Sequence, residues 1–138
     1  MKVTHSDPLW RELRVCVMEE GMPRHVQMLY NPMTGDSVID GRPFAEVHPV
    51  TPAFAADKDW YVQNELVVLD GRRFVKYGRT RILGPGRVVP LGTAYRGVPV
   101  YTEAGDHAFP AAVLYVPVRP GCEFQSYQWD LVTGGVRG

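Results

Sequence analysis

Nucleophilic side chains are scarce in this chain, which limits the chemistry it can perform. The 138 residues include only three serines and two cysteines. No serine lies in a Gly-x-Ser-x-Gly elbow, the turn that exposes the nucleophile of α/β-hydrolases. A triad can be drawn from Cys122, His107 and Asp106, but nothing in the sequence brings the three together. The sequence therefore argues against nucleophilic catalysis.

Motifs for metals and phosphates are also absent. The four histidines are scattered without a His-x-x-x-His pair, and there is no Cys-x-x-Cys. Glu46 and His48 would share one face of a strand, but no third ligand accompanies them, so we interpret residues 46–48 as a solvated strand face. The segment 84–86, Gly-Pro-Gly, lacks the glycines and the amide that a dinucleotide-binding loop needs. We therefore expect no metal site and no cofactor.

No apolar run is long enough to span a membrane. The longest, over residues 108–118, has eleven residues and two prolines, whereas a span needs about 20. The first seven residues turn polar at once and lack the apolar core of a signal peptide. We expect a chain without a membrane span that is cytoplasmic by default. A secreted chain whose signal peptide had been removed would look the same.

The two cysteines, Cys16 and Cys122, are too few for a disulfide scaffold or a four-cysteine zinc site. Free cysteines usually pack as small apolar groups. We therefore interpret the pair as two free thiols. A bridge between them is the alternative.

Glycine and proline are abundant, and this predicts a β-rich fold. The chain has 14 glycines and 12 prolines, and neither residue suits the interior of a helix. These residues are therefore expected in turns, and a short chain with many turns must consist of many short secondary-structure elements. Length and composition, with 45% hydrophobic and 22% charged residues, are those of a globular domain. We predict one domain over residues 1–138.

One helix is predicted near the N-terminus, over residues 6–20. The segment Ser6-Asp7-Pro8 can cap and begin a helix, and Gly21 can end it. Apolar residues follow the cap at i, i+4, i+7 and i+8: they are Leu9, Leu13, Cys16 and Val17. The competing interpretation is a strand, because apolar residues also alternate at positions 13, 15 and 17.

Paired β-hairpins are the strongest structural signal. Residues 38–44 match residues 68–74 at an offset of 30, and each segment has Asp-Gly between apolar runs. Asp-Gly favours the type I′ turn, which needs positive φ at both central residues. A looser copy lies over residues 94–101. Hairpin chemistry alone can produce such matches, so internal duplication stays an open alternative.

The remaining segments complete the predicted fold. Strands are expected over 25–30, 111–118 and 122–131, a turn over 31–36, a strand-poor loop over 48–59 and a flexible tail over 132–138. Together with the hairpins these elements predict an all-β or β-rich fold. We expect a small barrel or sandwich of about six to eight strands with one N-terminal helix.

The densest polar feature is a run of five bases and two aromatics within residues 72–81. Small β-barrels bind single-stranded nucleic acid through basic grooves and stacked aromatics. Here the bases fall on both faces of a strand and the net charge is zero, which argues against nucleic acid. The other interpretation is a charged edge that discourages pairing between sheets. The predicted binding residues are Arg72, Arg73, Lys76, Tyr77, Arg79 and Arg81.

These observations favour a non-catalytic protein-interaction or assembly module, either a subunit of a complex or a self-associating chain. Charge is uneven, with a net of −5 over residues 1–70 and +5 over residues 71–138, as in many polar partner surfaces. One alternative is a β-barrel that binds a small ligand at its mouth. Another is weak nucleic-acid binding through residues 72–81. The last is an enzyme with a dispersed site formed by Glu46, His48, Asp106, His107 and Cys122.

Overall fold

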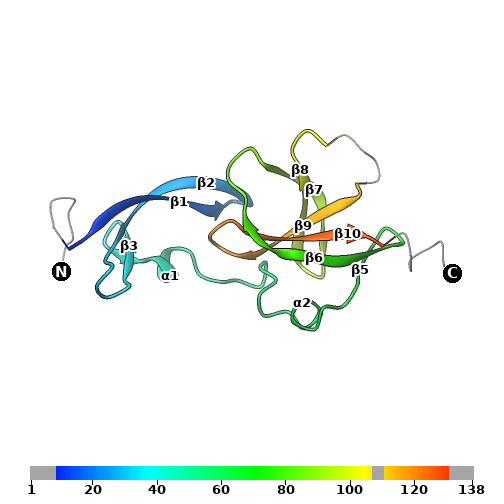
Figure 1. Ribbon diagram of the computed structural model, residues 1–138, viewed down its shortest axis with the longest axis horizontal. Helices are drawn as coiled ribbons and strands as arrows, with labels where there is room; N and C mark the ends of the chain where they lie inside the picture. The colour runs from blue at the N-terminus through cyan, green and yellow to red at the C-terminus, as the bar shows by residue number, and fades with distance from the viewer. Residues whose placement is uncertain (1–8, 107–110, 131–138) are drawn as a thin grey trace.

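The chain folds into two antiparallel sheets. A computed structural model describes residues 9–106 and 111–130 (Figure 1). The predicted tail, His107 and the first residues of the predicted helix lie outside these ranges. The elements are β1 (Arg11–Glu19), β2 (Met22–Tyr30), β3 (Ser37–Ile39), β4 (Arg42–Pro43), α1 (Phe44–Val47), α2 (Asp59–Val62), β5 (Val67–Leu69), β6 (Arg72–Ile82), β7 (Val88–Tyr95), β8 (Val98–Glu103), β9 (Val113–Arg119) and β10 (Glu123–Trp129).

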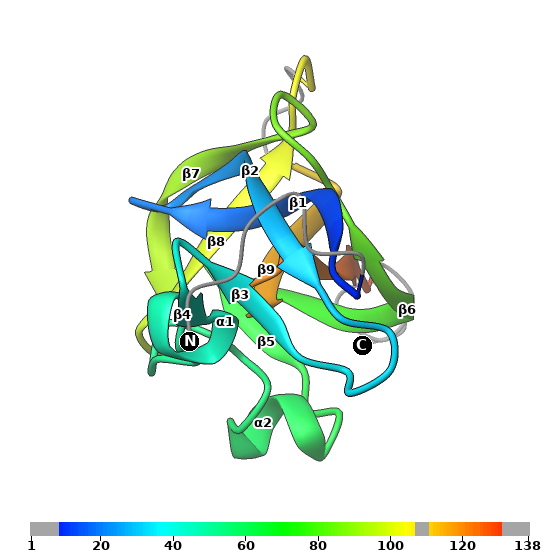
Figure 2. The same cartoon turned by 90° about the vertical axis from the view of Figure 1, so that its left-hand side faces the viewer.

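The two sheets differ in size and shape. The first has the order β1-β2-β3-β4, and with α1 we call it the arm; it forms one end of the elongated molecule in Figure 1. The second has the order β5-β6-β10-β9-β8-β7 and curls on itself, as the end-on view of Figure 2 shows. We call this sheet the half-barrel. The predicted β-rich fold built from hairpins is confirmed.

Helix is confined to two four-residue segments in the described chain, α1 and α2. Neither they nor any other described segment forms a helix long and apolar enough to cross a membrane.

The predicted N-terminal helix is wrong, because residues 11–19 form strand β1. β1 pairs with β2 from Arg11 opposite Tyr30 to Glu19 opposite Met22. Gly21, predicted to end a helix, lies in the turn of this hairpin, where Glu20 has φ of 51° and Gly21 has φ of 77°. The alternation at positions 13, 15 and 17 was therefore the correct period. Pairing with β2 makes this segment a strand, although its apolar residues also fit the spacing of a helix.

The three predicted hairpins are confirmed. They join β3 to β4, β5 to β6 and β7 to β8. Both turn residues have positive φ in each hairpin: 51° and 76° at Asp40-Gly41, 52° and 76° at Asp70-Gly71, and 49° and 86° at Arg96-Gly97. The first two hairpins belong to different sheets, one in the arm and one in the half-barrel. The structural feature that the two matching sequence segments share is therefore the Asp-Gly turn, and not a position in the same sheet.

Replacing the turn glycines is expected to destabilise the fold. No atom lies within 4 Å of a Cβ built on Gly41 or Gly71, so the cost comes from backbone strain at positive φ alone. Gly41→Ala and Gly71→Ala should each lower the free energy of unfolding by more than about 1 kcal/mol in urea titrations. Gly84→Ala is the matched control, because its φ lies outside the left-handed region and its added Cβ meets only His25 Nε2, at 3.7 Å. Equal stability of all three variants would contradict the turn assignment.

The hydrophobic core lies in the half-barrel and forms two clusters. The first surrounds Trp60 of α2, whose ring meets that of Tyr95 edge-on with centroids 5.0 Å apart. Its other buried members are Ala55, Val67, Phe74, Val98, Val100, Leu114, Val116 and Tyr127. These side chains occupy the interior of the half-barrel.

The second cluster lies where the half-barrel meets the arm. Its buried members are Leu83, Val88, Tyr101, Tyr115, Cys122 and Phe124, and Cys16 and Met18 of β1 pack against them. Two hydrogen bonds also join the parts: Met18 N–H donates to Pro120 O at 2.8 Å, and the Tyr101 hydroxyl donates to Gly21 O at 2.6 Å. Within the described residues the arm has no core cluster of its own.

The free-thiol interpretation is wrong, because Cys16 and Cys122 form a disulfide with a Cα–Cα distance of 5.7 Å. β1 crosses the end of the half-barrel beside the β9–β10 turn, and this places the two cysteines together. The two cysteines are 106 residues apart in the sequence, so no local sequence pattern predicts their pairing. The bridge fastens the arm to the half-barrel.

Candidate functional site

The basic segment forms strand β6, and a bulge interrupts its pairing. β5 pairs with the first three residues of β6, and β10 pairs along most of its length. Ser126 lies opposite Tyr77 and Phe124 opposite Arg81, so residues 78–80 of β6 face the single residue Gln125. Gly78 supplies the positive φ of the bulge, 69°. Such bulges redirect side chains and are frequent beside functional sites.

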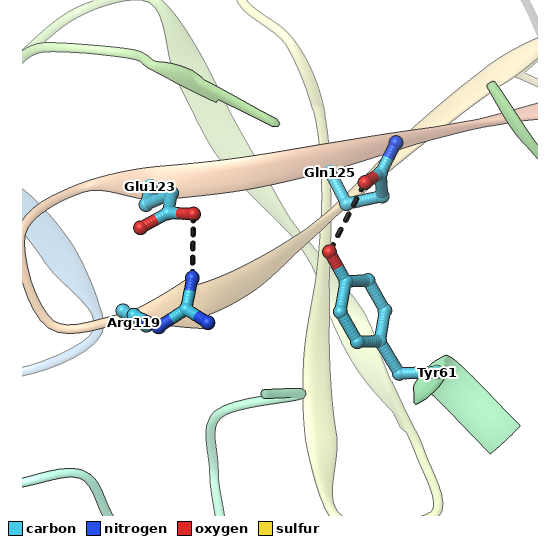
Figure 3. A network of polar contacts seen from close by, with 4 residues as sticks. All are labelled: Tyr61, Arg119, Glu123 and Gln125. Carbon is cyan, nitrogen blue, oxygen red and sulfur yellow. Dashed lines mark hydrogen bonds and ion pairs between the residues drawn. The ribbon is translucent and has the colours of Figure 1, made fainter. Parts of the chain in front are cut away.

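Gln125 holds the bulge from within the sheet. Its side chain is buried, and its Nε2 donates to Tyr77 O at 2.9 Å and to Gly78 O at 3.0 Å. The Tyr61 hydroxyl donates to Gln125 Oε1 at 3.1 Å, as Figure 3 shows. Burial, with a smaller contribution from Glu123 and against that of Arg119, raises the pKa of Tyr61. Tyr61 therefore stays a hydroxyl donor at neutral pH.

Removing the Gln125 amide is expected to destabilise the protein. Gln125→Ala leaves two strand carbonyls and the Tyr61 hydroxyl without this partner, and each unsatisfied buried group costs about 1–3 kcal/mol. Since Ser126 Oγ also donates to Tyr77 O, at 2.8 Å, we expect a loss of about 2–3 kcal/mol in urea unfolding. Gln128→Ala, at an exposed position on the same strand, should change stability by less than about 0.5 kcal/mol. Similar losses in both variants would mean that the amide does not hold the bulge.

A groove of 330 Å³ runs from the bulge across β10 to β9. We call it the basic groove. Its lining residues are Tyr77, Gly78, Arg79, Arg81, Val113, Tyr115, Ser126 and Gln128. No carboxylate is among these described residues. The groove thus combines positive charge, hydroxyl groups and apolar surface.

The arginines of the basic groove have no acidic partner among the described residues. Arg81 Nη2 donates to the Tyr115 hydroxyl at 3.4 Å, and both Arg79 and Arg81 are exposed. By contrast, two arginines outside the groove contact carboxylates: Arg42 contacts Glu46 at 3.7 Å, and Arg119 contacts Glu123 at 2.8 Å (Figure 3). Tyr77, 61% exposed, lines the same groove as the two guanidinium groups. An anionic group entering the groove would find both charge and a ring face.

The structure brings three of the six predicted binding residues together and separates the others. Tyr77, Arg79 and Arg81 line the basic groove. Arg72 lies over the Trp129 ring at 5.4 Å, and Arg73 is exposed outside the groove.

Lys76 turns toward α2. Its ammonium group donates to Tyr61 O and lies 3.6 Å from the centroid of the Tyr61 ring. Partial burial lowers the pKa of Lys76. Its role in the fold is to hold α2 against β6.

Sequence reasoning missed the residues that complete the groove. Tyr115 and Ser126 come from β9 and β10, and the buried Gln125 side chain fixes the bulge by its hydrogen bonds to the β6 backbone. The alternation along residues 123–129 could have indicated which β10 side chains share a face. The bulge and the strand order, which bring them to Arg81, are set by long-range pairing.

The dispersed enzyme site gains no support from the described residues. Cys122 is bound in the disulfide and is therefore not a free nucleophile in this structure. Residues 46–48 do not form the predicted strand, because Glu46 lies in α1 and pairs with Arg42 at 3.7 Å, while His48 ends that helix beside the Phe44 ring. Among described residues there is no group of three or more metal-ligating side chains.

The fold is β-rich, and its basic groove is lined by two arginines and no carboxylate among the described residues. In comparisons with known proteins, no family model matches this chain, and neither a curated protein nor a solved structure matches it.

Proposed function

We propose that this chain is a non-catalytic protein-interaction module whose basic groove receives an acidic segment of a partner protein. One observation carries the proposal. Arg79 and Arg81 lie with the exposed Tyr77 in a groove that no described carboxylate lines or neutralises. Hydrogen bonds between a guanidinium group and a carboxylate are among the stronger polar contacts in proteins.

The composition of the groove favours a peptide over nucleic acid. Val113 and Tyr115 supply apolar contact beside the arginines, as the core of a protein interface requires. A nucleic-acid strand needs cations that follow several successive phosphates. Arg72 and Lys76 contact Trp129 and Tyr61 instead, which leaves two arginines in the groove. The zero net charge of the chain adds no long-range attraction for phosphate.

The rigidity of the site also supports binding. Gln125 and Ser126 fix the backbone under Tyr77 and Gly78 with three hydrogen bonds. A surface that is ordered before the partner arrives loses little conformational entropy on binding. The bulge therefore presents the arginines in a constant arrangement.

Replacing the groove arginines should abolish most of this binding. We expect a fluorescent, capped hexapeptide of alternating glutamate and tyrosine to bind the wild type in an anisotropy titration. Arg79→Ala combined with Arg81→Ala should weaken its affinity about tenfold, equivalent to 1.4 kcal/mol. The matched control is Arg24→Ala with Arg87→Ala, which removes the same charge at exposed positions outside the groove.

Three results would contradict the proposal. They are absence of peptide binding, equal losses in the two double variants, and tighter groove-dependent binding of single-stranded DNA than of the peptide. The last result would favour the nucleic-acid alternative.

A further inference from the structure

A second cavity, of 540 Å³, gives access to one end of the disulfide. It lies between the arm and the half-barrel, and its lining residues are Arg14, Val15, Cys16, His25, Met28, Ser37, Phe44, Ile82 and Gly121. Cys16 lines this cavity and is partly exposed, whereas Cys122 is fully buried and does not line it. A molecule in the cavity can therefore reach the bridge at Cys16.

Groups that favour anions lie beside Cys16 in the cavity lining. Arg14 and Cys16 project from the same face of β1, because they are two residues apart on a strand. His25 lies directly opposite Cys16 in the β1–β2 register, and directly opposed side chains have Cβ atoms about 4.5–5.5 Å apart. No carboxylate is among the described lining residues. A nearby positive charge stabilises a thiolate, which is the form of a thiol that attacks disulfides.

We propose that this cavity is a thiol–disulfide exchange site for a small thiol that carries carboxylates. The thiolate sulfur attacks Cys16 Sγ, a new sulfur–sulfur bond forms, and the Cys16–Cys122 bond breaks. The electron pair leaves with Cys122, which takes a proton from solvent and becomes a thiol. Arg14 binds a carboxylate of the incoming thiol, while Phe44 and Ile82 pack against its apolar part.

Exchange at this site would control the attachment of the arm. Once the bridge opens, Met18–Pro120 and Tyr101–Gly21 remain as hydrogen bonds between the arm and the half-barrel. Cys122 is fully buried in the second core cluster, so its sulfur stays beside the mixed disulfide and is positioned to attack it and close the bridge again. The product must therefore be trapped to be observed.

The test uses the oxidised wild-type chain and reduced glutathione as the probe. Samples are quenched with iodoacetamide at timed intervals, and each cysteine is assigned by peptide mass spectrometry. We expect glutathione on Cys16 and the alkyl group on Cys122. Glutathione found mainly on Cys122, or no mixed disulfide under conditions where the protein stays folded, would overturn the proposal.

Two further variants test the role of the cavity. Ile82→Trp fills its rim at a 63% exposed position and should slow the reaction at least tenfold, whereas Val89→Trp, at an exposed position on β7, should not. Arg14→Gln should slow the reaction with glutathione about threefold, the size of an exposed charge interaction, and leave the neutral thiol 2-mercaptoethanol unaffected. Equal rates for Ile82→Trp and wild type would show that exchange requires unfolding, and this would contradict the proposed site.

Discussion

Replacing both cysteines with alanine is expected to lower the free energy of unfolding by about 4–5 kcal/mol. The bridge closes a loop of 106 residues, and the chain-entropy model gives about 4.7 kcal/mol for a loop of this length. Cys122 is also fully buried in the second core cluster, so its loss removes packing as well. Urea titration of Cys16→Ala with Cys122→Ala against the oxidised wild type measures the difference.

Dithiothreitol supplies the control for this experiment. It should destabilise the wild type and leave the double variant unchanged, because only the wild type has a bridge to reduce. Amide exchange should accelerate first in β1 and β2, since the arm depends on the half-barrel for its core contacts. A double variant within about 1 kcal/mol of the wild type, well below the effect of a long-loop disulfide, would mean that the bridge contributes little to holding the arm.

Trp60→Ala is expected to cost about 3–5 kcal/mol, the usual range for removing a large buried aromatic side chain. Trp60 is 3% exposed and packs against Tyr61, Tyr95 and Tyr127. Because it anchors the four-residue helix α2, its loss should also release Tyr61 from Gln125. We therefore expect weaker peptide binding in the basic groove together with the lower stability. Thermal unfolding and the anisotropy titration report the two effects separately.

Tyr127→Phe is the matched control in the same cluster. Its hydroxyl is buried without a hydrogen-bond partner among the described residues, and desolvation by burial raises the pKa of this tyrosine. Removing an unsatisfied buried hydroxyl should leave stability unchanged or raise it by about 1 kcal/mol. If Trp60→Ala behaved like Tyr127→Phe, the anchoring of α2 by Trp60 would be refuted.

Local chemistry explains which parts of the fold could be predicted from the sequence. The Asp-Gly pairs at 40–41 and 70–71 favour the positive φ that a type I′ turn requires, so the turns and their strands could be predicted from local sequence. Residues 9–20 carry both a helical stripe and strand alternation, and the choice depends on β2, a partner that the local pattern does not reveal. The disulfide was only the alternative to two free thiols for a similar reason, because strand packing brings together residues distant in sequence.

The basic groove was predictable only in part. Charge and aromatic content identified Tyr77, Arg79 and Arg81. A regular strand would have placed Arg79 and Arg81 on one face with Tyr77. The sequence pattern gave no indication that Gly78 begins a bulge or that the Lys76 side chain turns toward Tyr61. Tyr115 and Gln125 reach the segment through the order β6-β10-β9, which depends on the folding of the whole sheet.

A charge exchange between the groove and its peptide tests the proposed interaction most directly. Arg79→Glu combined with Arg81→Glu reverses the charge of the groove while Gln125 still holds the bulge. In anisotropy titrations, this variant should lose the alternating glutamate–tyrosine hexapeptide and bind the matching lysine–tyrosine hexapeptide, whereas the wild type should show the opposite preference. The same reversal at Arg24 and Arg87 should leave the wild-type preference intact. An unchanged preference for the glutamate peptide in the Arg79→Glu, Arg81→Glu variant would contradict binding of an acidic segment in this groove.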